Sequence, residues 1–200
     1  MTDADLGTAL PLPVASPEMQ ARLAQRRSAP AQALTAPGPS AAELDRILSL
    51  GARSPDHGKL FPWRFVVMGP QSRADLAAAL TPLAAAQAQP DKARAVLAKL
   101  IAAPVTVLVV STPVESRTVP LWEQQLSAGA VCMNLEHAAN AFGWSASWIT
   151  DWYAYDAEAK ALYGIGADEQ VAGFIHIGTL AEPPLERPRP DMAVKVTRLP

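Results

Sequence analysis

The chain has 200 residues, of which half are hydrophobic and 18% are charged, and its net charge of −2 argues against a disordered protein and against a broad nucleic-acid-binding surface. This length suffices for one domain with a sizeable core. The single cysteine, Cys132, excludes an internal disulfide and a cysteine-based zinc site, so we expect a reducing, cytoplasmic environment.

The first fifteen residues, rich in Ala, Leu and Pro, show no clear hydrophobic period. We expect them to form an extended arm (1–15) before a single domain that spans 16–200. The basic-then-apolar order of a secretory signal is not seen in the first twenty residues, and no uncharged apolar run reaches about 18 residues. We therefore expect neither a signal peptide nor a transmembrane helix, and no membrane partner.

A first helix is predicted to begin at Ser16-Pro17-Glu18, which combines a capping hydroxyl, a proline at the first helical position and an early acid. Met19 and Leu23 lie one turn apart and are expected to form its packing face. The helix is expected to end at Arg26-Arg27-Ser28. Residues 29–39 contain three prolines and a glycine and are predicted to be loop.

The second helix is predicted to begin at Ser40, because Ser40 and Glu43 form a capping-box pattern. It carries apolar residues at helical spacing, and Arg53 and His57 follow its C-terminal end. The β-rich run from Trp63 to Met68 is predicted to be a strand.

The remaining elements follow the same periodicities. Apolar runs predict strands at Val105–Val110, Trp144–Ile149 and Val171–Ile177, the first of them buried on both faces. Helices are predicted from Ser72 with Pro82 bending or ending it, from Pro90 through Ile101, over Leu121–Phe142, and from Asp156 to about Tyr163. From Pro183 onward the Pro- and Arg-rich tail is expected to lie across a partner.

The helix over 121–142 is apolar around much of its circumference, which is typical of a helix buried on several sides. The small residues at 127–130 permit close approach of another backbone. In a protein of this size, we expect a core helix that also contacts a second subunit.

Several common site motifs are missing from the sequence. There is no P-loop, no complete G-x-G-x-x-G and no G-x-S-x-G, and His57, His137 and His176 do not show metal-ligand spacing. We therefore name no metal site, and the general tendency of buried polar groups to be paired favours a structural role for each of the three histidines. We also name no catalytic acid or base.

Arg26, Arg27 and Ser28 together suit a phosphate, since guanidinium groups bind phosphate bidentately and a serine hydroxyl adds a neutral donor. The alternative is a helix end whose basic residues favour the helix dipole, and the spacing alone does not decide between the two. Arg53 and His57 add two donors that could reach a planar polar ring or its ribityl chain. The alternative for them is a surface turn in which Asp56 pairs one of the basic groups.

The segments Arg26-Arg27-Ser28, Ser54-Pro55-Asp56-His57 and Pro62-Trp63-Arg64-Phe65 resemble the N-terminal half of the FMN-dependent nitroreductase family, in particular small bacterial NAD(P)H nitroreductases with a Pro-Asp-His turn. Trp122-Glu123-Gln124, Ser127-Ala128-Gly129, Trp148-Ile149-Thr150 and Gly173-Phe174 match in order, so the resemblance runs from about 20 to 180. It implies an α+β nitroreductase-like fold, with a mixed central sheet flanked by helices, and an intertwined homodimer with FMN at the interface.

The resemblance also implies site residues. Arg26, Arg27 and Ser28 would hold the phosphate and ribityl chain of FMN, and Arg53 and His57 would match positions on the flavin of the partner subunit. Trp148, Ile149 and Thr150 would match the family's third segment, although Ile149 stands where family members often have Arg. The segment from Ala138 to Gly143 matches one assigned to the nicotinamide.

The implied activity is hydride transfer from NADH or NADPH through FMN to a nitroaromatic, a quinone or a similar electron-poor substrate, with ping-pong kinetics. Trp152, Tyr153 and Tyr155 would wall the substrate side or belong to the core. Two other readings stay open. The protein is an FMN-binding carrier or sensor without catalysis, or a helical interaction protein whose long helix serves to dimerise.

Overall fold

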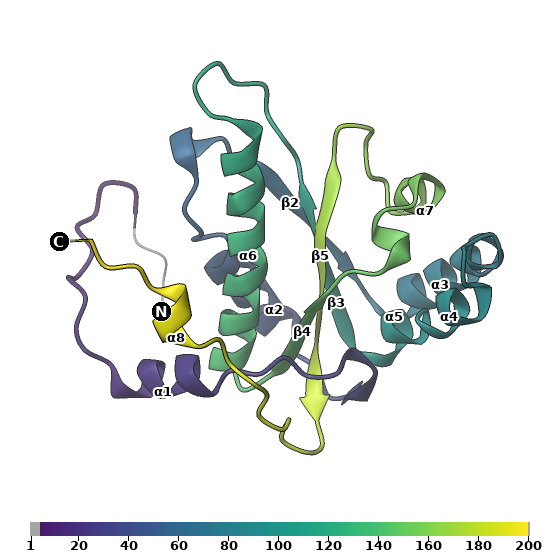
Figure 1. Ribbon diagram of the computed structural model, residues 1–200, viewed down its shortest axis with the longest axis horizontal. Coiled ribbons are helices and arrows are strands. Elements are labelled where there is room, and N and C mark those ends of the chain that lie inside the picture. Colours follow the sequence, from purple (N-terminus) through teal and green to yellow (C-terminus); the bar gives the residue numbers. More distant parts are fainter. Residues whose placement is uncertain (1–4, 200) are drawn as a thin grey trace.

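A computed structural model describes residues 5–199 and shows an antiparallel sheet with helices on both faces (Figure 1). The expected α+β class is confirmed. The strands are β1 (Leu34–Thr35), β2 (Trp63–Met68), β3 (Val105–Ser111), β4 (Ser145–Ile149) and β5 (Gln170–Leu180). The helices are α1 (Pro17–Gln25), α2 (Ala41–Gly51), α3 (Pro70–Ala85), α4 (Pro90–Ala95), α5 (Ala98–Ala102), α6 (Leu121–Ala141), α7 (Ala157–Leu162) and α8 (Met192–Lys195), with short 3-10 turns at Ala31–Ala33, His57–Lys59 and Trp152–Ala154.

The strands follow the order β1-β5-β3-β2, and β4 also pairs with β5. The resemblance implied a mixed sheet, but every pair of neighbouring strands within residues 5–199 is antiparallel. The connection through α3, α4 and α5 explains this for β2 and β3. Met68, at the end of β2, pairs with Thr106, near the start of β3, so the crossover returns the chain to the end of the sheet that it left.

Helices cover both faces of the sheet, which divides the core into two layers. In β3, Val107 and Val109 face the layer built with α2 and α6, whereas Leu108 and Val110 face the layer built with α3, α4, α5 and α7. Successive strand residues point to opposite faces, so a strand covered on both sides is apolar throughout. The prediction that this strand is buried on both faces is confirmed.

The helix starts predicted at Ser16 and Ser40 are confirmed by their caps. The Ser16 hydroxyl accepts a hydrogen bond from the Met19 amide at 3.2 Å, and Ser40 and Glu43 form a complete capping box. The longest helix, α6, is followed by Gly143, the predicted helix stop, which has φ +86°, a conformation that glycine adopts without strain.

Four local predictions differ from the structure. The helix predicted from Ser72 begins two residues earlier, at Pro70. Leu34–Thr35 was predicted to be loop but forms β1, because Leu34 is fully buried and its backbone pairs with Leu180. The helix predicted from Pro90 through Ile101 is divided into α4 and α5 at Val96. Pro82 does not end α3, which continues to Ala85.

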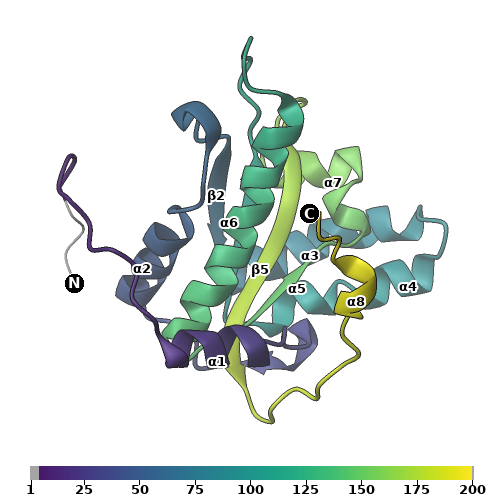
Figure 2. The same ribbon diagram turned by 60° about the vertical axis from the view of Figure 1, so that its left-hand side comes forward.

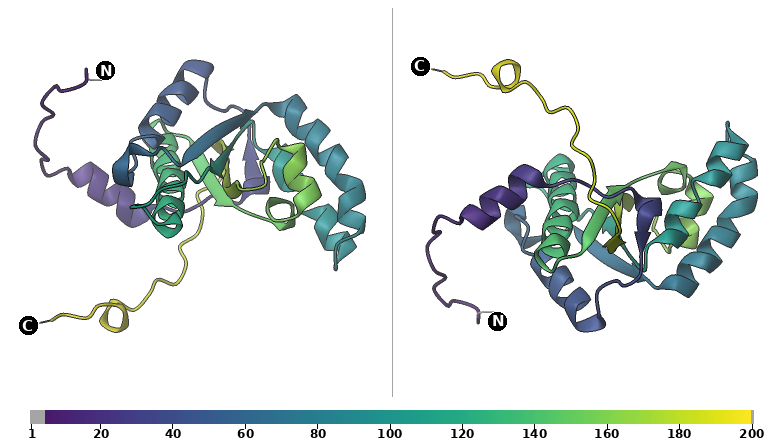
Figure 3. Two further views of the ribbon diagram at one scale, coloured as in Figure 1. Left: turned by 90° about the horizontal axis from the view of Figure 1, so that it is seen from above. Right: turned by 90° about the horizontal axis from the view of Figure 1, so that it is seen from below.

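The two ends of the chain project from the body (Figure 3). Residues 5–15 are exposed and form no helix or strand, and residues 1–4 of the predicted arm lie outside the described part. Met19 is 63% exposed and Leu23 is 50% exposed, so residues 5–199 leave the expected packing face of α1 largely uncovered. Within residues 5–199, no helix is both long enough and apolar enough to cross a membrane.

Candidate cofactor-binding site

Arg26 lies directly after α1, and α1 crosses the molecule near the end of α6 (Figure 2). This position brings the Arg26 guanidinium to Glu136, four residues after Cys132 on α6. Arg26 Nη1 donates to Glu136 Oε2 at 3.3 Å and to Ser28 Oγ at 3.1 Å. The sequence-predicted pair Arg26 and Ser28 is therefore joined, and a carboxylate that the sequence analysis did not single out holds both.

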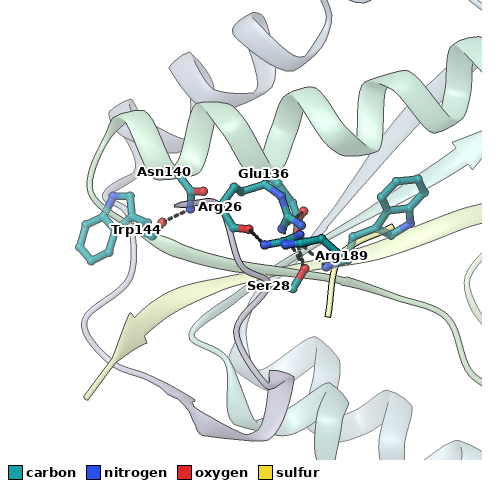
Figure 4. Close-up of polar contacts among 7 residues, drawn as sticks. Arg26, Ser28, Glu136, Asn140, Trp144 and Arg189 are labelled. Carbon is teal, nitrogen blue, oxygen red and sulfur yellow. Dashed lines mark hydrogen bonds and ion pairs between the residues drawn. The ribbon is translucent and has the colours of Figure 1, made fainter. Parts of the chain in front are cut away.

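Figure 4 shows Glu136 beside Arg26 and Ser28, and Glu136 also contacts the third predicted segment through the Trp148 amide. Its Oε1 accepts from Ser28 Oγ at 3.2 Å and from the Trp148 backbone amide at 3.0 Å. Ser28 and Glu136 are 108 residues apart in the chain. No local pattern in the sequence of α6 marks Glu136 as their common partner.

The Glu136 carboxylate is almost completely buried, with 4% of its side chain exposed. Burial raises the pKa of Glu136, and the Arg26 charge with the hydrogen bond from Ser28 opposes that rise. Cys132 lies one turn earlier on α6. Burial, with a smaller effect of Glu136, raises the pKa of the Cys132 thiol to about 12.

A polar cavity of about 300 Å³ adjoins this cluster. The C-terminal tail lies beside it, since Arg27 Nε donates to the Leu185 carbonyl at 2.9 Å and Arg189 Nη2 donates to the Arg26 carbonyl at 3.3 Å. The segment predicted for the nicotinamide contributes Asn140 and Gly143. The full lining is Arg22, Gln25, Arg26, Arg27, Ala29, Asn140, Gly143, Trp144, Ser145, Leu180, Pro183 and Pro184.

The donors of this site fit an anion such as the phosphate of FMN. Nε and Nη2 of Arg26, and both terminal nitrogens of Arg27, make no hydrogen bond within residues 5–199. Arg22 adds a third guanidinium to the cavity. A set of unused guanidinium donors at a cavity matches the bidentate recognition of phosphate better than a basic helix end alone would.

The segment 148–150 provides a flat aromatic surface and an apolar anchor. The Trp148 indole lies against Gly173, where a Cβ atom would collide with it, and Trp148 Nε1 donates to the Ala172 carbonyl at 3.1 Å. Ile149 packs against the core layer of α3, α4, α5 and α7. Thr150 Oγ1 accepts from the Tyr155 hydroxyl at 2.8 Å.

Arg53 and His57 lie near the opposite end of α6. His57 Nδ1 is 2.6 Å from Glu123 Oε2, and both side chains are substantially exposed. Arg53 is exposed as well. The alternative in which Asp56 pairs a basic group is wrong, because Asp56 Oδ2 accepts from the Phe61 amide at 2.8 Å.

The structure does not bring the two halves of the predicted site together within one chain. Glu123 and Glu136 are 13 residues apart on α6, which corresponds to about 20 Å at 1.5 Å per residue. The two halves therefore lie about 20 Å apart along α6, and no contact joins them within residues 5–199.

The other candidate residues have structural surroundings. Tyr153 is fully buried and Trp152 Nε1 donates to the Ala93 carbonyl, so these two belong to the core, whereas Tyr155 is exposed. His176 Nδ1 pairs with Thr106 Oγ1 at 2.8 Å, but its buried Nε2 has no partner, so the expectation of a fully paired histidine is only half met. No group of metal-ligating side chains occurs within the described part of the chain.

A family model provides the comparison that decides the class. The model of the Nitroreductase family matches residues 23–179. The chain belongs to this family. Two curated relatives agree with the match. "Putative NAD(P)H nitroreductase YdjA" of Escherichia coli (strain K12) is 34% identical over 78% of this chain and 85% of its own length. "Putative NAD(P)H nitroreductase" of Haemophilus influenzae is 36% identical over 73% of this chain and 80% of its own length.

Solved structures confirm the nitroreductase-like fold. A nitroreductase-like family protein from Bacillus cereus has a TM-score of 0.80 at 17% identity and covers 94% of this chain and 99% of its own. A nitroreductase from Bacteroides fragilis, crystallised with bound FMN, has a TM-score of 0.73 at 21% identity and covers 92% of this chain and 100% of its own.

Proposed function

We propose that this member of the Nitroreductase family is a cytoplasmic, homodimeric FMN-dependent oxidoreductase that transfers hydride from NADH or NADPH to a nitroaromatic, a quinone or a similar electron-poor ring. The observation that carries the proposal is the joining of Arg26 and Ser28 beside a cavity with unused guanidinium donors. The names of its relatives in Escherichia coli and Haemophilus influenzae support the nicotinamide as the hydride donor.

The predicted site residues divide into two groups. Arg26, Arg27 and Ser28 would bind the phosphate and ribityl chain, with Trp148, Ile149 and Thr150 beside them on the same chain. Arg53 and His57 would come from the partner subunit, which the position of His57 at Glu123, near the opposite end of α6 from Glu136, supports. When bound, FMN supplies the hydride-transfer chemistry, and use of one site in turn by nicotinamide and acceptor gives ping-pong kinetics.

The chain's own residues bind and orient. Arg26 and Arg27 neutralise the phosphate and fix its position by charge-assisted hydrogen bonds. The contact of His57 Nδ1 with Glu123 Oε2, at 2.6 Å, would orient the imidazole ring and leave Nε2 for a ligand. The flat indole of Trp148 on Gly173 and the burial of Ile149 hold the third segment rigid.

The experiment is a flavin spectrum followed by anaerobic reduction. The purified protein should show bound flavin absorbance, or gain it with FMN, and excess NADH or NADPH should bleach it. A colourless protein that gains no flavin absorbance with FMN contradicts the proposal.

The second candidate is an FMN carrier or sensor, favoured by Ile149, which packs into the core where family members often have Arg. The same titration separates the two candidates. If neither nicotinamide reduces bound flavin, the oxidoreductase is rejected and the carrier or sensor is supported.

A further inference from the structure

Glu136 is the only residue that contacts Arg26, Ser28 and Trp148 through one side chain in the described part of the chain. These three partners come from two different segments: the end of α1 and strand β4. The carboxylate accepts from a guanidinium, a hydroxyl and a backbone amide, and it is almost fully buried. A buried carboxylate is costly unless such partners compensate it, so its presence calls for a role.

We propose that Glu136 is a positioning residue, which holds the Arg26 guanidinium by Nη1 and thereby presents its Nε and Nη2 to the phosphate of FMN. This inference rests on the proposed function. The geometry carries it, because all the hydrogen bonds of the Arg26 side chain use Nη1, and the ligand-binding edge of the guanidinium is left unused within residues 5–199.

Two effects of Glu136 on phosphate binding oppose each other. An arginine held before the ligand arrives loses little rotamer freedom on binding, and this pre-organisation strengthens binding. The negative charge of Glu136 repels the phosphate and weakens binding. Pre-organisation should dominate, because three donors already stabilise the negative charge of the carboxylate: the Arg26 guanidinium, the Ser28 hydroxyl and the Trp148 amide.

The variant Glu136→Gln separates positioning from support of the fold. The Trp148 amide is a donor only, so the oxygen of the new amide must remain on it. The new amide nitrogen then faces Arg26 Nη1, donor against donor. The substitution therefore keeps the contact with β4 and removes the acceptor that holds Arg26.

The measurement is the Kd of the apoprotein for FMN and for riboflavin, from quenching of flavin fluorescence. Riboflavin has no phosphate and serves as the ligand control. Glu136→Gln should weaken FMN binding about tenfold, the lower range for one charge-assisted hydrogen bond, and leave riboflavin binding unchanged. Glu158→Gln, an exposed glutamate on α7, is the matched variant control and should change neither.

Other results overturn the inference. Unchanged or tighter FMN binding contradicts positioning, and an equal loss for FMN and riboflavin shows a merely structural role. In the Arg26→Ala background, Glu136→Gln should cause no further loss of FMN affinity, and a full additional loss also overturns the inference.

If Glu136→Gln does not fold, Arg26→Lys tests the same claim with the carboxylate intact. Lysine keeps the charge without the guanidinium fork, so FMN binding should weaken and riboflavin binding should not; unchanged FMN binding overturns the inference. If the wild-type protein binds neither FMN nor riboflavin, the proposed function itself is rejected. If the wild-type protein binds FMN and the variants bind it with the same affinity, only the role of Glu136 is rejected.

Discussion

The two ends of α6 carry the two halves of the predicted site, and they differ in how complete they are. At the Glu136 end, a buried carboxylate joins Arg26, Ser28 and the Trp148 amide. At the Glu123 end, the His57–Glu123 pair is exposed, and the apolar side chains of Leu121, Trp122 and Leu126 are also exposed.

In the proposed dimer, each chain would supply one half of each cofactor site. The Glu136 end is closed by the chain's own residues. The Glu123 end has a polar pair beside apolar side chains that residues 5–199 leave exposed, as expected of a surface that meets a second copy. Three experiments test whether the two ends differ in this way.

The largest effect is expected from Leu126→Glu. Leu126 is 53% exposed in the chain, and a charge there would be buried without a partner in the proposed dimer. The variant should become monomeric and lose about 100-fold or more in FMN affinity, because each site then lacks the partner's half. Sedimentation and flavin titration measure the two results.

The matched control is Ile101→Glu, which places the same charge at an equally exposed apolar residue of α5, on the other face of the sheet. It should remain dimeric and bind FMN normally. A monomeric Leu126→Glu protein that keeps full FMN affinity would show that one chain holds the complete site.

A smaller effect is expected from Arg26→Ala, which acts on the closed end. Loss of a charged hydrogen bond to phosphate should cost about 1.5–3 kcal/mol of FMN binding, and Glu136 would lose its cation. The melting temperature should therefore fall as well. Arg94→Ala, at an exposed surface pair on α4, is the control and should change neither quantity measurably. Equal FMN affinity of Arg26→Ala and Arg94→Ala would reject the proposal that Arg26 binds the phosphate of FMN.

The third experiment is chemical labelling, which should leave function least affected. It compares the reactivity of Cys132, near the Glu136 end of α6, with that of His57, at the Glu123 end. Because the thiolate reacts and the Cys132 pKa is about 12 against about 8.5 for a free cysteine, native Cys132 should alkylate at pH 7–9 roughly three orders of magnitude more slowly than in the unfolded chain. The rate rises with pH in both states, but the native thiolate stays scarce until pH approaches its pKa.

Exposed His57 should instead react with diethyl pyrocarbonate in monomeric Leu126→Glu and be protected in the wild-type dimer. Peptide mapping measures both residues. Fast alkylation of native Cys132 would contradict burial at the Glu136 end. Equal labelling of His57 in the two proteins would contradict its protection by a second subunit at the Glu123 end.

Local sequence patterns were sufficient to predict most of the fold and the association of Arg26 with Ser28. The cap at Ser16, the capping box at Ser40 and the apolar run of β3 depend on neighbouring residues, so they could be predicted. Arg26 and Ser28 could be proposed as a pair because they lie two residues apart.

The missing parts depend on contacts between distant segments. Glu136 meets Arg26 across 110 residues, and Glu123 meets His57 across 66. The two-residue strand β1 exists only because β5 is there to pair with it. None of these contacts has a periodicity or spacing that a single sequence displays, since the topology of the sheet and of α6 creates them.

Subunit complementation tests the split site most directly. Arg26→Ala and His57→Ala chains, unfolded together and refolded as a mixture, should form heterodimers in which one of the two sites has both an intact Arg26 and an intact His57. With random pairing the mixture should recover about one quarter of wild-type flavin-site occupancy at limiting FMN, well above either variant alone. A mixture that only averages the two variants would contradict a site shared between chains.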